Sequence, residues 1–314
     1  MKPNRMKRIR RLVLLGTAGL LLACILLAAL SALSNARLPR HSQVVDCLSE
    51  RDKAHLAEVL HLRRSVGEAV WPGWGQADIP AIVYNEEYAF VVGYAEPADG
   101  WVKVPANERR GGPWQTVPGE TFAGQPYWRQ RLPDGVRPEN FALLVGQRWG
   151  YGIQTQDWMK ISLVAPIRED LPALLRPVFP YRLFVGALVE GSDKYISLHA
   201  HEAFHAYQGM AVPERLAEAE RANWRWEKEY PWADKALQEA WQVELNLLAS
   251  ALRADSPETT VELTRQFLAQ RAARRAVAGL KAELTDYERQ REWLEGLARY
   301  AELETWRQAA TSGY

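Results

Sequence analysis

The pentapeptide His201-Glu202-Ala203-Phe204-His205 constrains the fold of this chain more than any other stretch. Residues four apart lie on one face of an α-helix, so a helix here would aim both imidazole rings at one point. Glu202 would then lie beside that point without having to be a ligand. Ser192-Asp193 before the stretch and Gly209 after it predict a helix from about Asp193 to Met210.

The pentapeptide resembles the H-E-x-x-H motif of zinc metallopeptidases. This resemblance implies one Zn²⁺ ion held by His201 and His205, with Glu202 as the general base. Zinc with two histidines needs a third protein ligand and an open position for water. Glu295-Gly-Leu-Ala-Arg-Tyr300 resembles the E-G-x-A-x-Y form of the Glu-zincin (gluzincin) branch, in which the third ligand is a Glu on a later helix. The resemblance therefore implies Glu295 as that ligand.

Two features depart from the familiar Glu-zincin pattern. The gap between His205 and Glu295 is far longer than in the best-known members. Arg299 stands four residues after Glu295, where those enzymes often carry an Asp that orients a ligand histidine. The orienting carboxylate must then come from another part of the chain.

Neighbouring residues leave several roles open. His199 lies two residues before His201 and so faces another side of the helix, which favours a packing or supporting role. The hydrogen-bond donor to the developing oxyanion is predicted to be Tyr300, with Tyr287 as an alternative. If Glu295 is not a ligand, it is a helix carboxylate exposed to solvent. The other candidates for the third ligand are then Glu292, Glu302, Glu244 and Glu239.

The predicted chemistry is hydrolysis of a peptide bond. Zinc bound by two imidazoles and one carboxylate lowers the pKa of its water towards neutrality. Glu202 would accept the proton of that water and pass it to the leaving amine. The expected partner is a peptide or protein substrate, which an edge strand could hold in an extended conformation.

The amino terminus predicts a membrane anchor. Six Lys and Arg residues within the first eleven positions precede an uncharged run, whose apolar part extends from Leu12 to about Leu33. That length suffices to cross a bilayer as a helix, and the basic cluster favours a cytoplasmic amino terminus. We predict a cytoplasmic tail at 1–11, a single-pass signal anchor at 12–34 and a linker at 35–45. The remainder would face the periplasm or the cell exterior from the inner (cytoplasmic) membrane.

Two other fates of this segment remain open. Ala32-Leu33-Ser34 could be a signal-peptidase site, and Leu21-Leu22-Ala23-Cys24 resembles a lipoprotein processing box. The apolar run continues through Ile25 past the cysteine, which favours an uncleaved anchor. Cys47 is the one cysteine beyond the anchor, so no intrachain disulfide is available there.

Length and charge exclude some classes of function. A chain of 314 residues can bury one sizeable core or two small ones. The 39 basic and 38 acidic residues nearly cancel, and no basic stripe lies beyond the amino terminus, which argues against nucleic acid as a partner. Oligomeric state is left open.

The region 46–190 is predicted to be an α/β lobe with mainly antiparallel pairing, because its links are short. Apolar spacing predicts a helix over 47–70, and a second helix runs from Thr155 or Gln156 to about Leu171. The stretch from Pro105 to Gly135 is dense in Gly and Pro and predicts loop with brief extended pieces. The predicted strands cover 81–84, 88–94, 101–104, 141–145, 149–154 and 181–189.

The region 191–314 is predicted to be a helical, zinc-binding lobe, which makes the whole an α+β, zincin-like fold. Segments near 213–228, 232–254, 257–279 and 281–309 show helical periodicity. Two alternative functions remain: a non-catalytic membrane-anchored interaction protein whose metal braces two helices, and a di-iron carboxylate protein. The second would use Glu58-Val-Leu-His61 as another E-x-x-H beside Glu202-x-x-His205.

Overall fold

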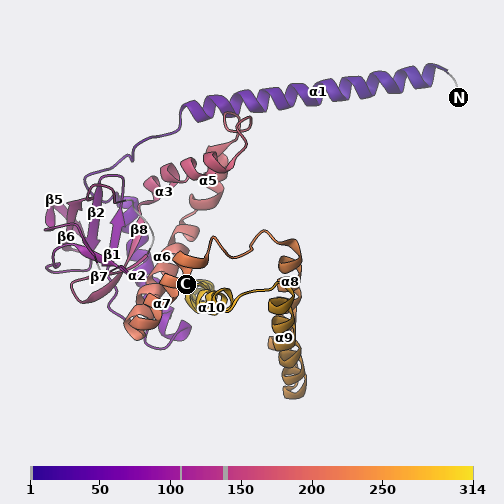
Figure 1. Cartoon of the computed structure of the whole chain (residues 1–314). Helices are drawn as coiled ribbons and strands as arrows, with labels where there is room; N and C mark the ends of the chain where they lie inside the picture. Colours follow the sequence, from indigo (N-terminus) through magenta and orange to yellow (C-terminus); the bar gives the residue numbers. More distant parts are fainter. Residues whose placement is uncertain (1–2, 107, 137–140, 314) are drawn as a thin grey trace. The chain divides into compact units, whose positions relative to one another are not determined.

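The computed structural model describes residues 3–106, 108–136 and 141–313, with the backbone alone for residues 3–13. This part of the chain is a mixed α+β protein, in which one eight-stranded sheet is followed by helices (Figure 1). The α+β class predicted from the sequence is therefore confirmed. The chain forms two compact units: the first comprises Met1–Lys103, Glu108–Tyr207 and Ala301–Tyr314, and the second Val104–Asn107 and Gln208–Tyr300.

The sheet has the strand order β4-β3-β7-β8-β1-β2-β6-β5. β1 pairs with β8 in parallel, and the other pairings among the described strands are antiparallel, as predicted. One face carries an aromatic core that includes Tyr84, Trp101 and Phe141. The strands are β1 Ala81–Tyr84, β2 Tyr88–Val92, β3 Trp101–Lys103, β4 Arg109–Arg110, β5 Gln115–Phe122, β6 Gln125–Arg131, β7 Phe141–Val145 and β8 Arg148–Gln154.

The prediction of loop with brief extended pieces between Pro105 and Gly135 is wrong, because β5 and β6, strands of eight and seven residues, lie there. β5 is an edge strand, where a proline removes no ladder hydrogen bond. Pro118 and Gly119 lie within a register shift between Thr116 and Thr121. The residues that suggested a break are therefore absorbed by a bulge inside the strand.

The predicted strand at Tyr181–Val189 is wrong as well, because this segment is the helix α5. Of its nine residues, Tyr181 and Val185 are buried, four positions apart on one helical face. A short apolar run cannot be assigned to a strand or a helix by periodicity alone. The other large apolar side chains of α5, Leu183, Phe184 and Leu188, are exposed.

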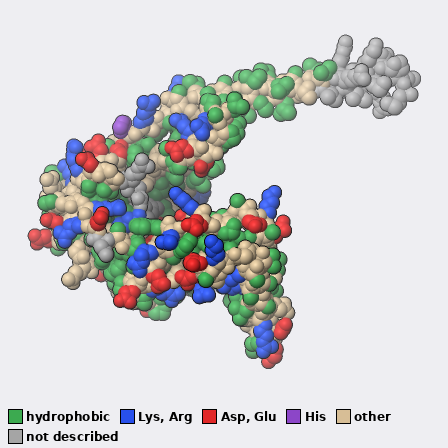
Figure 2. All heavy atoms as spheres, in the orientation of Figure 1, with side chains coloured by type: hydrophobic (Ala, Val, Ile, Leu, Met, Phe, Trp, Pro, Cys, Tyr) green, Lys and Arg blue, Asp and Glu red, His purple; other side chains and the backbone are tan. Residues whose placement is uncertain are grey.

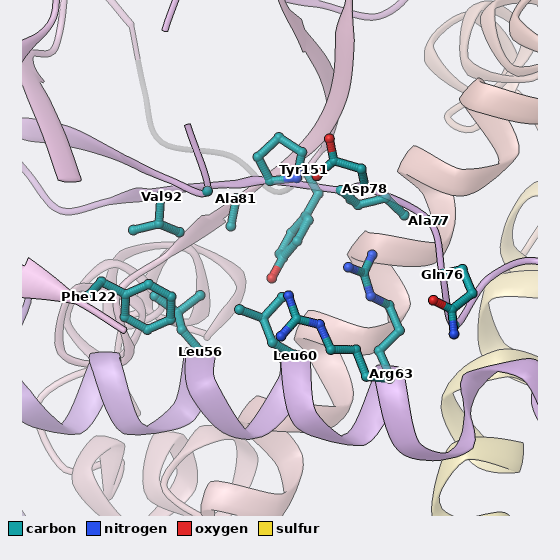
Figure 3. Close-up of a pocket in the computed structure, with 15 residues that line it drawn as sticks. Leu56, Leu60, Arg63, Gln76, Ala77, Asp78, Ala81, Val92, Phe122 and Tyr151 are labelled. Carbon is teal, nitrogen blue, oxygen red and sulfur yellow. The ribbon is translucent and has the colours of Figure 1, made fainter. Parts of the chain in front are cut away.

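Helix α2 (Glu50–Val70) packs against the sheet, as Figure 3 shows for Leu56, Leu60 and Arg63 opposite Tyr151. Ser49 caps the helix by accepting a hydrogen bond from the backbone N–H of Asp52. Arg63 is buried, and burial lowers the pKa of its guanidinium from the ordinary value.

Gly67 near the end of α2 predicts a measurable stability effect. A Cβ atom at Gly67 would lie 2.8 Å from the Cα of Gly75, so the backbone itself would have to move. We expect Gly67→Ala to lower the free energy of unfolding by about 1–3 kcal/mol. Urea denaturation checks this result, with Gly296→Ala as the control, because a Cβ there meets nothing within 4 Å. Equal effects of the two substitutions would contradict the close approach.

The remaining helices follow the predicted segments, apart from a break at Leu163 and a π-helical turn. Among the described residues one stretch, Leu14–Ala36 within α1, is long and apolar enough to span a membrane or to act as a signal sequence. The helices are α1 Pro3–Ala36, α3 Gln156–Ser162, α4 Val164–Asp170, α6 Ser192–Ala211, α7 Pro213–Trp226, α8 Lys235–Leu252, α9 Pro257–Val277, α10 Ala282–Arg291, the π-helix η1 Glu292–Gly296 and α11 Leu297–Thr311.

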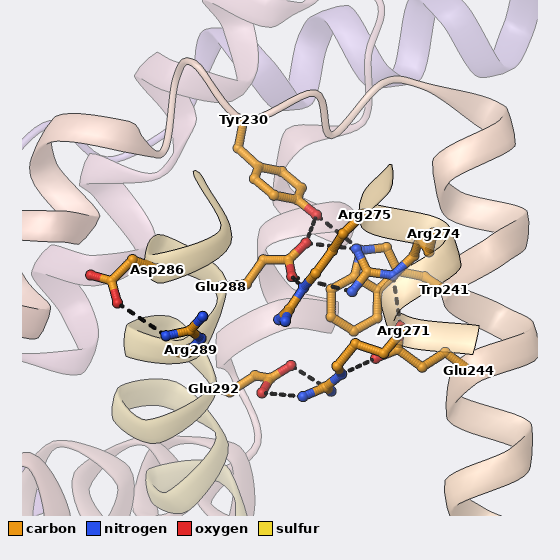
Figure 4. Close-up of polar contacts among 10 residues, drawn as sticks. All are labelled: Tyr230, Trp241, Glu244, Arg271, Arg274, Arg275, Asp286, Glu288, Arg289 and Glu292. Carbon is orange, nitrogen blue, oxygen red and sulfur yellow. Dashed lines mark hydrogen bonds and ion pairs between the residues drawn. The ribbon is translucent and has the colours of Figure 1, made fainter. Parts of the chain in front are cut away.

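A buried ion network joins α8, α9 and α10 in the second unit (Figure 4). Arg274 donates to Glu244 at 2.7 Å and to Glu288 at 2.6 Å, and its guanidinium lies 3.7 Å from the ring centroid of Trp241. Burial raises the pKa of Glu288, but hydrogen bonds from Arg274, Tyr230 and Arg275 outweigh burial and hold that pKa below its ordinary value.

Candidate metal centre

Helix α6 carries the histidine motif, which confirms the predicted helix to within a residue at each end. The loop after α2 holds this helix in place. The ring of Phe204 packs edge-on against Trp71 and Trp74 at centroid distances of 5.5 and 5.6 Å. The Tyr207 hydroxyl donates to the carbonyl oxygen of Pro72 at 2.6 Å. The aromatic residues that end α2 therefore fix the rotation of the motif helix.

The helix formed by η1 and α11 lies beside α6 and runs antiparallel to it. Near the start of α6, Trp306 Nε1 donates to the Ser197 hydroxyl at 2.5 Å. Near its end, Gln208 Nε2 donates to the carbonyl oxygens of Trp293 at 2.9 Å and Leu294 at 3.3 Å. These carbonyls belong to the π-helical turn, whose altered hydrogen bonding Gln208 satisfies.

His201, His205 and Glu295 offer ligand atoms that all lie within 4.8 Å of one another. The Nε2 atoms of the two histidines are 3.1 Å apart. Two nitrogens on a tetrahedral zinc ion, each at about 2.05 Å, would be about 3.3 Å apart. The donor set, its spacing and its half-buried to buried position therefore fit one zinc ion.

Glu302 lies against the same histidine from the other side. Its carboxylate oxygen is 3.5 Å from Nδ1 of His201, and both side chains are largely buried. An imidazole that gives Nδ1–H to a carboxylate presents Nε2 as the ligand atom. The sequence suggested Glu302 as an alternative third ligand, but here it is placed to orient His201.

Glu302→Gln is expected to weaken zinc binding by about 10–100-fold without removing it, since a carboxylate that holds a ligand histidine in position contributes to metal affinity to this extent. Competition with a zinc-chelating dye measures the affinity. Glu304→Gln is the matched control, because Glu304 lies on the same helix and pairs with Arg307. An affinity for zinc equal to that of the wild type in Glu302→Gln would show that Glu302 does not orient the ligand.

Glu202 is 7% exposed on α6, next to the predicted ligands. Tyr151 of β8 reaches the same region, and burial raises the pKa of its phenol, with the charge of Glu202 adding to the shift and that of Arg63 opposing it. Composition and spacing did not single out Tyr151. In the sequence Tyr151 is marked only by its place on a predicted strand, and that place does not indicate its proximity to Glu202.

His199 is fully buried and does not belong to the metal-binding group. Its Nδ1 lies 3.0 Å from the Tyr151 hydroxyl, and its ring packs edge-on against Tyr195. Burial lowers the pKa of His199 to about 3, so the ring is neutral at physiological pH. This arrangement agrees with the packing or supporting role favoured by the sequence.

The other candidate residues lie as follows. Glu292 and Glu244 both pair with Arg271 in the ion network, and Glu239 is exposed on α8. Tyr300 is 48% exposed on α11, and its role stays a prediction. Tyr287 is buried in a cluster with Tyr230 and Leu237, as a structural tyrosine would be.

Gly296 does not mark a close approach between helices. A Cβ atom there would meet no other atom within 4 Å. The glycine instead ends the π-helical turn η1.

Comparison with known proteins gives no family assignment. No protein-family model matches the chain, and there is no significant match among curated proteins or solved structures. The function is therefore inferred from the site itself.

Proposed function

We propose that this chain is a membrane-anchored, extracytoplasmic zinc metallopeptidase. The observation that carries the proposal is that Glu295, 90 residues beyond His205 in the sequence, offers a ligand atom within 4.8 Å of those of His201 and His205. The residue composition of this group fits zinc, which is held by imidazole and carboxylate donors in catalytic sites. Resemblance to Glu-zincins suggested the same three residues.

The site residues would divide the work of hydrolysis. Zinc, when bound here, would supply Lewis acidity and an acidified water. Glu202 would accept one proton from water while the water oxygen bonds to the peptide carbonyl carbon. It would then deliver that proton to the leaving amine as the C–N bond breaks. Tyr300 would donate a hydrogen bond to the carbonyl oxygen on which charge develops. The products are a carboxylate and an amine.

The rest of the chain would set where the enzyme acts. Helix α1 is long and apolar enough to cross the bilayer, and the basic residues before it favour a cytoplasmic amino terminus. The site would then face the periplasm or the cell exterior. An extended peptide could add to β5, whose outer edge is a sheet edge.

Metal analysis of the full chain in detergent tests the proposal. We expect one zinc ion per chain, and Glu295→Gln should lower zinc affinity by at least about 100-fold, since a charged ligand is lost. Glu292→Gln is the control, because that carboxylate, three residues earlier, pairs with Arg271 instead. Two iron ions per chain, or equal zinc affinity in Glu295→Gln and the wild type, would refute the zinc site.

The same geometry supports a second candidate function. A metal at this site would also link α6 to the π-helical turn, which Gln208 of α6 already contacts through two hydrogen bonds. Its role could then be structural only, as a brace between helices. Catalysis would distinguish the two, because a brace needs no general base. A di-iron centre has less support, since the group that could hold a metal among the described residues includes neither Glu58 nor His61.

A further inference from the structure

The segment between Leu171 and Val189 carries an apolar surface on the outside of the first unit. Leu174 is 89% exposed and Leu183 is 75% exposed. In α5 Tyr181 and Val185 are buried, and Leu183 projects from the opposite side of the helix. Phe184 and Leu188 flank the buried face with 44% and 47% exposure. We call this surface the 174–188 patch, defined by Leu174, Leu175, Leu183, Phe184 and Leu188.

The patch is fastened to the end of the predicted membrane helix. Asn35 in the last turn of α1 donates from Nδ2 to the carbonyl oxygens of Pro177 at 3.0 Å and Phe179 at 2.8 Å. The chain leaving α1 then runs beside α5, where Leu38 and Pro39 line a groove together with Tyr181 and Val185. The patch therefore begins where α1 ends.

The contact also extends back along α1. Residues 14–27 are exposed, and Figure 2 shows hydrophobic side chains along this part of the helix. From Ala28 onward a stripe at helical spacing is half-buried, and α1 contacts α5. Ala28 and Asn35 are seven residues apart, which corresponds to about 10 Å along a helix. If Leu14–Ala36 crosses the bilayer, this stripe lies in its outer part.

We propose that the 174–188 patch inserts into the outer leaflet of the bilayer that α1 spans. The inference rests on the proposed anchoring by α1 and adds a second, interfacial contact with lipid. An apolar helix face at the boundary between headgroups and acyl chains gains free energy from the area that it removes from water. Arg182 is exposed beside the patch and can reach lipid phosphates, and Arg176, which donates to the carbonyl oxygens of Leu171 and Glu169, is exposed there too. Glu190 lies beyond its end.

Site-specific fluorescence on the full chain tests this inference. Cys24→Ser and Cys47→Ser remove both native thiols. Single cysteines then replace Leu183, Leu188, Leu27 in α1, and Thr116, an exposed residue of β5. Each variant is labelled with an environment-sensitive dye and reconstituted in vesicles of phosphatidylethanolamine and phosphatidylglycerol. Nitroxide-bearing lipids report contact with the bilayer, and aqueous iodide reports exposure to water.

The inference expects labels at 183 and 188 to be quenched by nitroxide lipids several-fold more than the label at 116, and to be shielded from iodide. The label at 27 separates the two proposals. If 27 is in lipid while 183 and 188 behave like 116, the patch proposal is overturned and anchoring stands. If 27 is in water, anchoring fails and the patch proposal fails with it. Labels shielded from iodide but not quenched by lipid would show that protein covers the patch, which also overturns the inference.

Discussion

Glu202→Gln should abolish peptide hydrolysis while zinc stays bound. The amide is isosteric with the carboxylate but cannot accept the proton of water, and a general base contributes about 10²–10⁴-fold to a rate. Glu202 is not one of the three predicted ligands, so zinc affinity should stay within about threefold of the wild type, well short of the 10–100-fold loss typical of supporting residues. The measurement pairs turnover of a fluorogenic peptide library with metal content of the same samples.

Glu214→Gln provides the control for this experiment, because Glu214 is exposed in the first turn of α7. It should leave both turnover and zinc content unchanged. Hydrolysis that survives in Glu202→Gln would contradict the assignment of the base. A wild-type chain that binds one zinc ion and cleaves no peptide in the library would instead favour the bracing function.

Arg274→Met is expected to have the largest effect on stability, a loss of about 3–5 kcal/mol in the free energy of unfolding. The guanidinium is fully buried between Glu244 and Glu288, which are also almost wholly excluded from solvent. Methionine keeps much of the contact with Trp241 but leaves two buried carboxylates with fewer partners. Chemical denaturation followed by tryptophan fluorescence measures the change.

The matched substitution on the same helix is Arg265→Met. Arg265 pairs with Glu262 at the surface, so the expected loss is below about 0.5 kcal/mol. Adding Glu244→Gln and Glu288→Gln to Arg274→Met should recover part of the stability, because the uncompensated charges are then gone. A loss for Arg274→Met as small as that for Arg265→Met would show that the network contributes little.

Local sequence patterns predicted those helices and strands whose apolar residues are spaced so that they face the core. The helices α2 and α9 begin after serine caps that the sequence displays, and β1, β7 and β8 are short apolar runs between turn residues. β5 could not be predicted in this way, since an edge strand buries little and tolerates Pro118. α5 could not either, because a nine-residue, largely apolar segment can be read as a strand or as a helix.

For the candidate site, too, the sequence predicts local spacing but not contacts between distant elements. His201 and His205 are four residues apart, and local helix geometry alone brings them together. Glu295 was suggested by a resemblance and not by spacing. Glu302 could not be assigned to His201 from the sequence, because that contact depends on how two distant helices pack. Tyr151 reaches His199 from the sheet, which is again a tertiary contact.

The π-helical turn has a consequence for the spacing of residues along the last helix. In an unbroken α-helix, residues seven apart differ in direction by only about 20°. Glu288 and Glu295 are seven apart, yet one binds Arg274 in the ion network and the other lies with the histidines. The extra residue in the turn shifts the phase between the two by roughly the 100° of one residue. One helix can therefore serve two separate polar clusters, and the number of residues between the clusters matters more than which residues they are.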